Sequence, residues 1–262
     1  MHALADAEWR DATPEPAPLP DRVWLPSVQV LVCRARAGQH RGLALAAKGG
    51  TNDENHNHKD LGSFIVAAHG RPLLVDIGKP TYTAQTFSAA RYGIRAMQSG
   101  WHNAPAPHDL EQGEGPAFLA KVVQRPDASV GLPVSLSLDL SRAYPLGDAE
   151  HWNRVFRLVS GERIEIVDTW RLEAREGRPA VAAVHLIAAG SVSVQDGAAL
   201  VTEAGRGIRV TTAEGVLPAT EEWELDDPEL IRVWGPHLTR LTYPIDVSAG
   251  SLTTIVEEVE AW

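Results

Sequence analysis

Cysteine is almost absent from this sequence. Cys33 is the only cysteine among 262 residues, so no disulfide can form within the chain. Because it lies in the apolar run of residues 30–33, we interpret Cys33 as a small buried hydrophobe rather than a nucleophile. Long apolar runs are missing as well, since stretches such as residues 64–68 are far too short to cross a bilayer. We therefore expect no membrane partner.

Basic residues are also scarce. The chain has 24 Lys and Arg against 34 Asp and Glu, which gives a formal net charge of −10. Nucleic-acid binding needs clustered Lys and Arg, so this balance argues against a nucleic-acid partner. An acidic ligand would need local cations, such as Lys79, Arg91 and Arg95, or cations supplied by another domain.

The first 21 residues lack the pattern of a packed element. Proline occupies every second position from Pro14 to Pro20, so residues 1–21 are predicted to be an extended linker before one domain in residues 22–262. No charged segment followed by an apolar one opens the sequence, so no signal peptide is predicted. The expected location is the cytoplasm if the chain start is native, and the periplasm or the exterior if the chain is truncated.

From residue 22 onward the pattern is that of β-strands. Short apolar or alternating runs recur at close spacing between turn residues, which predicts an all-β fold, a large antiparallel β-sandwich of the supersandwich kind. Two pairs of runs, 63–68 with 72–76 and 154–160 with 162–170, have the spacing of hairpins. Further strands are predicted at residues 28–32, 43–47, 132–140, 182–188, 198–203, 206–212, 229–234, 239–246 and 251–259.

One segment departs from the β pattern. Within residues 84–98, Phe87, Ala90, Ile94 and Met97 fall three or four positions apart, which favours a helix, whereas a glycine inside the segment weakens it. We predict one short helix or irregular segment in a long loop.

The densest group of polar side chains lies at residues 55–60, which read Asn-His-Asn-His-Lys-Asp. His56 and His58 are two apart, so on an extended segment they would point to the same side. Two later features add to this one. Asp76 ends an apolar run, where a buried carboxylate needs a partner or a cation, and His102 stands beside Asn103.

Two imidazoles and one carboxylate from separate segments make a plausible Zn²⁺ site with an open position. Spacing alone leaves Ca²⁺ as an alternative, although two imidazoles favour zinc. Asp60 or Asn103 could accept a hydrogen bond from a ligand ring and fix its tautomer. The competing interpretation is a solvated polar loop without a metal.

Taken together, these residues resemble the heparinase II/III family of polysaccharide lyases. The resemblance implies an N-terminal α/α toroid followed by a β-sandwich, with the active site between them. It also implies β-elimination of uronic-acid polysaccharides, in which Tyr and His transfer the protons and a structural Zn²⁺ lies in the sandwich near the cleft. The matching segments are residues 48–50, 55–64, 71–78, 82–83, 91–92 and 102–103.

The resemblance assigns roles position by position. His56 resembles the catalytic histidine on the sandwich side, and the metal ligands would be His58, Asp76 and His102. A proton next to a carboxylate is weakly acidic, so the site must neutralise the carboxylate and stabilise the developing enolate. The groups that would suit this role, or would bind the substrate beside it, are Asn55, Arg91, Tyr82 and the imidazole of His56.

The sequence departs from the family in one large respect, because the toroid and its catalytic tyrosine are missing. The expected partners are an acidic polysaccharide or oligosaccharide and an α/α toroid, either upstream or on a separate chain. The isolated chain is expected to be inactive or weakly active. The alternatives are a carbohydrate-binding module that uses some of the eight tryptophans, or a structural metal-binding sandwich. Heparan-like, alginate-like and other uronate polymers all fit as substrates.

Overall fold

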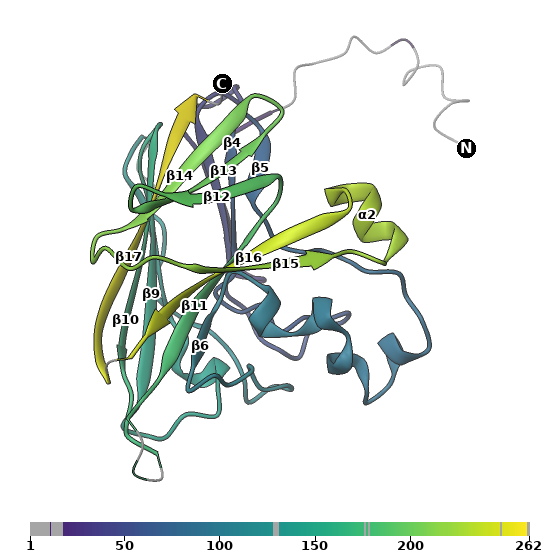
Figure 1. The fold of residues 1–262 in the computed structure, drawn as a ribbon, viewed down its shortest axis with the longest axis vertical. Helices are drawn as coiled ribbons and strands as arrows, with labels where there is room; N and C mark the ends of the chain where they lie inside the picture. The colour runs from purple at the N-terminus through teal and green to yellow at the C-terminus, as the bar shows by residue number, and fades with distance from the viewer. Residues whose placement is uncertain are drawn as a thin grey trace.

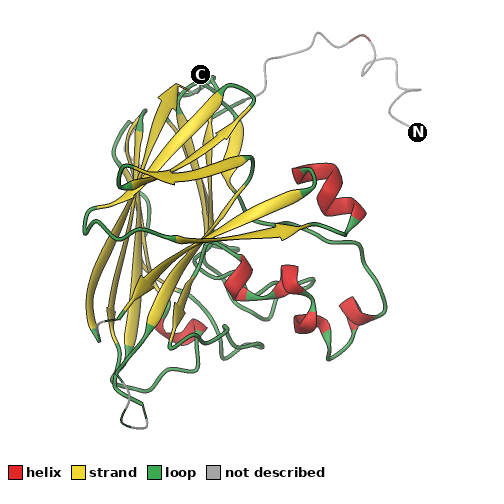
Figure 2. Ribbon diagram, in the orientation of Figure 1, coloured by secondary structure: helices red, strands yellow, loops and turns green. Residues whose placement is uncertain are grey.

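Two antiparallel sheets pack face to face in the computed structural model, which describes residue 11 and residues 18–127, 131–175, 177, 179–246 and 248–260 (Figures 1 and 2). The fold is thus the predicted β-sandwich. The predicted linker, residues 1–21, lies almost wholly outside the described residues. Among the described residues, no helix has the length and apolar character that a bilayer crossing requires.

The first sheet has nine strands. Its order is β1-β2-β3-β4-β5-β11-β16-β15, with β6 paired to β11 outside this path. The strands are β1 (Arg22–Leu25), β2 (Val30–Arg34), β3 (Leu43–Lys48), β4 (Phe64–Ala68), β5 (Arg71–Leu74), β6 (Pro105–Pro107), β11 (Ala182–Ala188), β15 (Ala219–Glu224) and β16 (His237–Ile245).

The second sheet has eight strands in the order β12-β13-β14-β17-β10-β9-β8-β7. Its hairpin β9–β10 and the hairpin β4–β5 of the first sheet were both predicted from turn spacing. The strands are β7 (Lys121–Gln124), β8 (Val134–Asp139), β9 (His151–Ser160), β10 (Arg163–Arg171), β12 (Ser191–Gln195), β13 (Ala198–Glu203), β14 (Arg206–Thr212) and β17 (Ala249–Glu260).

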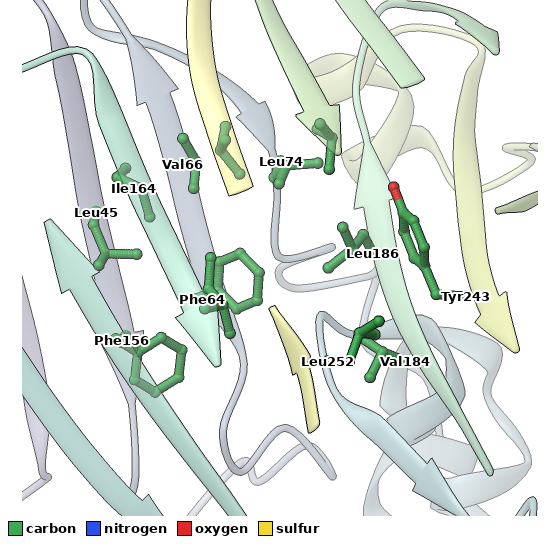
Figure 3. Close-up of a cluster of buried hydrophobic side chains, with 14 of the residues drawn as sticks. Leu45, Phe64, Val66, Leu74, Phe156, Ile164, Val184, Leu186, Tyr243 and Leu252 are labelled. Carbon is green, nitrogen blue, oxygen red and sulfur yellow. The ribbon is translucent and has the colours of Figure 1, made fainter. Parts of the chain in front are cut away.

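The core forms where the inner faces of the two sheets meet. Alternate residues of β3 and β8 are buried, as the period of two requires. Figure 3 shows side chains of both sheets meeting in this layer, among them Phe64 of β4 and Phe156 of β9, whose ring centroids lie 5.8 Å apart. Cys33 is fully buried here, as predicted, and desolvation raises the pKa of its thiol to about 12, which keeps it protonated.

A second, smaller apolar cluster covers the outer face of the first sheet. Every residue of β11 is buried, because one face meets the core and the other meets the long connection between β5 and β6. Trp101 from this connection packs edge-to-face on Trp223 of β15, at 4.9 Å between ring centroids. This cluster fixes the connection that carries Asp76 and His102 against the sheet.

The segment predicted to be a short helix or irregular consists of separate single turns. Residues 84–98 lie within a series of four 3₁₀ turns: η2 (Gln85–Phe87), η3 (Arg91–Gly93), η4 (Arg95–Met97) and η5 (Ser99–Trp101). Side chains compete for the backbone carbonyls that a continuous helix would use, since Gln98 Nε2 donates to Tyr92 O and Gln85 Nε2 donates to Ala90 O. A further 3₁₀ turn, η6 (Ser141–Ala143), follows β8.

The strand predicted at residues 229–234 is wrong, because this segment is the helix α2 (Pro228–Trp234). Its β-branched residues suggested a strand, but the flanking residues favour a helix. Asp227 Oδ1 accepts hydrogen bonds from the backbone N–H groups of Glu229 and Leu230, and Pro228 fits the first helical turn. Gly235, at φ +80°, ends the helix.

Candidate metal and proton-transfer site

The site loop, residues 49–62, connects β3 to β4 and is closed at its base. Lys48 Nζ lies 2.7 Å from Asp60 Oδ1, which ties the two ends of the loop together. Asp60 is thus engaged by a lysine and not by an imidazole, so its predicted role in orienting a ligand ring is wrong. At the start of the loop, Gln29 Oε1 accepts a hydrogen bond from Gly50 N at 2.9 Å. Gly50 is at φ +91°, where a side chain is strained, so the sharp entry requires glycine.

The structure brings the three predicted metal ligands together. The rings of His58 and His102 meet edge-to-face at 5.5 Å between centroids. His102 Nδ1 lies 2.9 Å from Asp76 Oδ2, and the same oxygen accepts a hydrogen bond from Ser63 Oγ at 2.9 Å. Asp76 Oδ1 accepts from Gly78 N at 3.2 Å. The site loop, the segment after β5 and the segment after η5 therefore converge on one point.

Burial and the neighbouring charges set different protonation states for the two histidines. Desolvation, helped by the proximity of His102, lowers the pKa of His58 to about 4. His58 is therefore neutral near pH 7, with a ring nitrogen lone pair available. Burial also opposes charge on His102, but Asp76 outweighs it and raises the pKa of His102, while the imidazole lowers the pKa of Asp76.

These groups suit a cation in type, although they are not arranged around one. Among the described residues, no three His, Cys, Asp or Glu side chains are placed so that they could already hold a metal ion. Asp76 Oδ2 is engaged by His102 Nδ1 instead. His102 Nε2, however, is buried and has no hydrogen-bond partner in the described part of the chain. An orphan nitrogen beside a neutral imidazole is the donor set that zinc prefers, so the residues fit the ion.

His56 lies on the solvent side of the same loop. Its backbone is at φ +58°, which turns the chain sharply between Asn55 and Asn57. The His56 ring stacks on Tyr82 at 5.4 Å with an angle of 3°, and both rings contact Phe87 edge-on. Phe87 is 67% exposed. His56 is thus separated from His58, which faces inward, by the turn between them.

Of the predicted substrate-binding residues, Asn55 precedes His56 in sequence, Tyr82 stacks on its ring, and Arg91 lies in η3. Asn55 is exposed and Tyr82 is half-buried under His56. Arg91 is half-buried, and its Nε and Nη2 atoms are buried without a hydrogen-bond partner among the described residues. A guanidinium with unused donors is suited to a carboxylate or sulfate.

Two asparagines hold the site together through contacts that the sequence did not reveal. Asn57 Nδ2 donates to Asn52 Oδ1 and to Tyr92 Oη, each at 3.4 Å, and so links the loop to η3. Asn103 had been expected to accept a hydrogen bond from a ligand ring, but its side chain contacts backbone groups instead. It donates to the carbonyls of Phe64 and Val75 and accepts from Ile187 N, which joins three strands or strand ends.

A buried ion pair supports the site from the second sheet. Arg154 of β9 and Asp168 of β10 are both 0% exposed, and Arg154 Nε lies 2.8 Å from Asp168 Oδ1. Arg154 Nη1 also donates to Gly62 O at 2.9 Å and to Asn103 O at 2.7 Å. The sequence signal for this pair was weak, because Asp168 could only be expected to share the face of Ile164 and Ile166.

Comparison with known protein families shows to which family the chain belongs. The family described as heparinase II/III-like, C-terminal, matches residues 19–233. The chain belongs to this family. No curated protein matches the heparinase II/III-like chain, whereas several solved structures share its fold.

Similar structures include heparan sulfate lyases and heparinases III. The heparan sulfate lyase HepC from Pedobacter heparinus aligns over 96% of this chain at 15% identity with a TM-score of 0.70. A heparinase III, the BT4657 gene product, aligns over 95% at 15% identity with a TM-score of 0.71. In both cases the chain spans only 38% of the matched structure. These identities establish a shared fold, and the heparinase II/III-like chain corresponds to part of each larger protein.

Proposed function

We propose that this chain is the β-sandwich half of a lyase that cleaves uronic-acid polysaccharides by β-elimination. The observation that carries the proposal is the arrangement of one loop. His56 lies at the surface and stacks on Tyr82. His58, two residues later, faces His102, whose ring pairs with Asp76. One loop thus offers a proton-transfer group outward and a candidate metal ligand inward.

The chemistry needs a proton to leave C5 of the uronate and a second proton to reach the departing glycosidic oxygen. An exposed imidazole can perform either transfer at neutral pH. Arg91, with its unused donors, and the amide of Asn55 would neutralise the uronate carboxylate and stabilise the enolate as negative charge builds up. Tyr82 would orient the His56 ring by stacking and present an apolar surface to the sugar.

The metal ligands would be His58, His102 and Asp76. A bound zinc ion would supply structural cross-linking of the loop to the ends of β5 and η5, rather than contact with the sugar. The residues of the chain carry out the proton transfers themselves. With His58 neutral, a ring-nitrogen lone pair on the inner side of the loop would be available to the ion.

The second half of the active site would come from an α/α toroid. The chain spans 38% of the matched lyase structures, and the exposed Phe87 beside His56 offers an apolar contact at this face. The formal net charge of −10 also suits a site whose remaining cations come from a partner. The isolated chain is expected to be inactive or weakly active.

A pure carbohydrate-binding module is the weaker alternative. That interpretation relied on tryptophans as sugar platforms, but three of the tryptophans belong to the packed interior. Trp101, Trp152 and Trp170 are at most 5% exposed and serve the packing of the sandwich. A purely structural metal domain would not explain a surface histidine held by stacking.

The test is a domain replacement. The chain is joined to the α/α toroid of a heparinase III in place of that enzyme's own sandwich, and heparan sulfate is supplied, with alginate for comparison. Mass spectrometry should find oligosaccharide products that end in an unsaturated uronate. Their mass is lower by one water than that of the products of hydrolysis. Saturated ends, or no cleavage by a folded fusion protein, would contradict the proposal.

A further inference from the structure

A separate pocket lies at the open edge of the sandwich. Strand β1 ends the first sheet and β7 ends the second, so neither has a neighbour on its outer side within the described sheets. Between them is a pocket of about 340 Å³, lined by Trp24 of β1 and Lys121 and Val122 of β7. A ligand could therefore enter at this edge without disturbing either sheet.

The lining is basic, in contrast to the chain as a whole. Lys121, Arg125 and Arg142 contribute three cations and Asp139 a single carboxylate. Lys121 and Arg125 are exposed, and their side chains make no hydrogen bond or ion pair with any described residue. The carboxylate of Asp139 is already engaged by the backbone N–H and the hydroxyl of Ser141. A local positive field of this kind, in a protein of net charge −10, selects for an anion.

One wall of the pocket is aromatic. Trp24 is half-buried against the core, and its indole Nε1 is buried without a hydrogen-bond partner among the described residues. An indole face beside cations is a combination that binds sugar rings carrying carboxylate or sulfate groups, because the ring packs on the indole while the anions meet Lys and Arg. An acidic peptide would use the cations but would gain little from the indole.

The pocket adjoins the loop that carries His56. Gln29, which also lines the pocket, accepts from Gly50 N, and Gly50 O accepts from Ala120 N at 3.0 Å. Thr51 and Leu119 form a β-bridge between the same two segments. The wall of the pocket is therefore continuous with the first residues of the site loop, so one extended chain could contact both.

We propose that the pocket formed by Trp24, Lys121, Arg125 and Arg142 is a binding subsite for an acidic oligosaccharide, remote from the reacting bond. The inference rests on the proposed function for its substrate class. The subsite would hold a sulfate- or carboxylate-bearing sugar at the edge of the sandwich while another part of the same chain lies at His56. It would also supply a local group of cations in a chain whose formal net charge is −10.

The test is binding of a heparan sulfate octasaccharide by isothermal titration calorimetry. The double variant Lys121→Glu/Arg125→Glu should weaken the affinity roughly tenfold or more, and Lys121→Gln/Arg125→Gln by a smaller factor. The matched control is Arg36→Glu/Arg41→Glu, the same charge change at exposed arginines whose side chains have no hydrogen-bond or ion-pair partner among the described residues and line a different pocket. It should change the affinity by less than about twofold. Circular dichroism confirms that each variant is folded.

Three results would overturn the subsite: no binding by the unaltered chain, equal weakening by both charge reversals, or a poly-glutamate peptide that binds as tightly as the octasaccharide. The lyase proposal fails separately. Charge-dependent binding at this pocket without any unsaturated product from the fusion protein would refute the lyase only. Unsaturated product, together with an octasaccharide affinity that does not change when Lys121 and Arg125 are replaced, would refute the subsite only.

Discussion

Replacing Arg154 by methionine is expected to lower the free energy of unfolding by about 3–5 kcal/mol, because it leaves the carboxylate of Asp168 buried without its cation. Both side chains are 0% exposed, and Trp152 Nε1 would be the one side-chain donor left to Asp168 among the described residues. The carbonyls of Gly62 and Asn103 would also lose their donor. Urea unfolding measures the change.

The matched control for this prediction is Arg163→Met. Arg163 pairs with Glu165 of its own strand and with Glu257 of the neighbouring strand β17, each at 3.0 Å, but its side chain is 37% exposed. Screening by solvent limits the expected cost to less than about 1 kcal/mol. An Arg154→Met variant that unfolds at the same urea concentration as this control would show that the buried pair does not hold the two sheets and the site together.

Replacing His56 by alanine is expected to reduce the rate of elimination by about 10²–10⁴-fold in the fusion with a toroid, the range for loss of a general acid or base. The fold should survive, because His56 is exposed and its packing is limited to Tyr82 and Phe87. The readout is the rate at which unsaturated product forms under saturating substrate. His56→Gln, which keeps a polar side chain but cannot take up a proton near pH 7, should be nearly as slow.

His40→Ala provides the control for the proton-transfer role. His40 is an exposed histidine that packs near Gly70, at the turn between β4 and β5, and its loss should leave the rate unchanged. If His56→Ala retained more than about a tenth of the activity, another group would have to transfer the proton, and His56 would only contribute to substrate binding.

The strands were predictable because burial in a two-layer sandwich imposes a period of two. Alternation within residues 132–140 reports directly which face meets the core. The helix α2 was misread because Leu230, Ile231 and Val233 suit a strand by composition, while the deciding signals were the Asp227 cap and Pro228. A capping pattern is shorter than an apolar run and is easily outweighed by it.

The sequence was enough to nominate the residues of the candidate site, but not the contacts that these residues make. The spacing of His56 and His58 suggested that both would face one cleft, yet the turn at His56, φ +58°, sends them to different sides. No local signal could show that Asp76 would bind the ring of His102, that Asp60 would pair with Lys48, or that Arg154 would reach across from the other sheet. These contacts join segments far apart in the sequence and depend on how the sheets pack.

Metal content of the purified chain is the most direct test of the site, measured by inductively coupled plasma mass spectrometry on protein prepared without chelators. The account predicts about one zinc per chain in the unaltered protein and in His40→Ala. His58→Ala should lose the zinc and unfold at a lower temperature. Absence of stoichiometric metal from the unaltered chain, zinc retained by His58→Ala, or zinc loss with an unchanged unfolding temperature would contradict a structural metal site built on His58, Asp76 and His102.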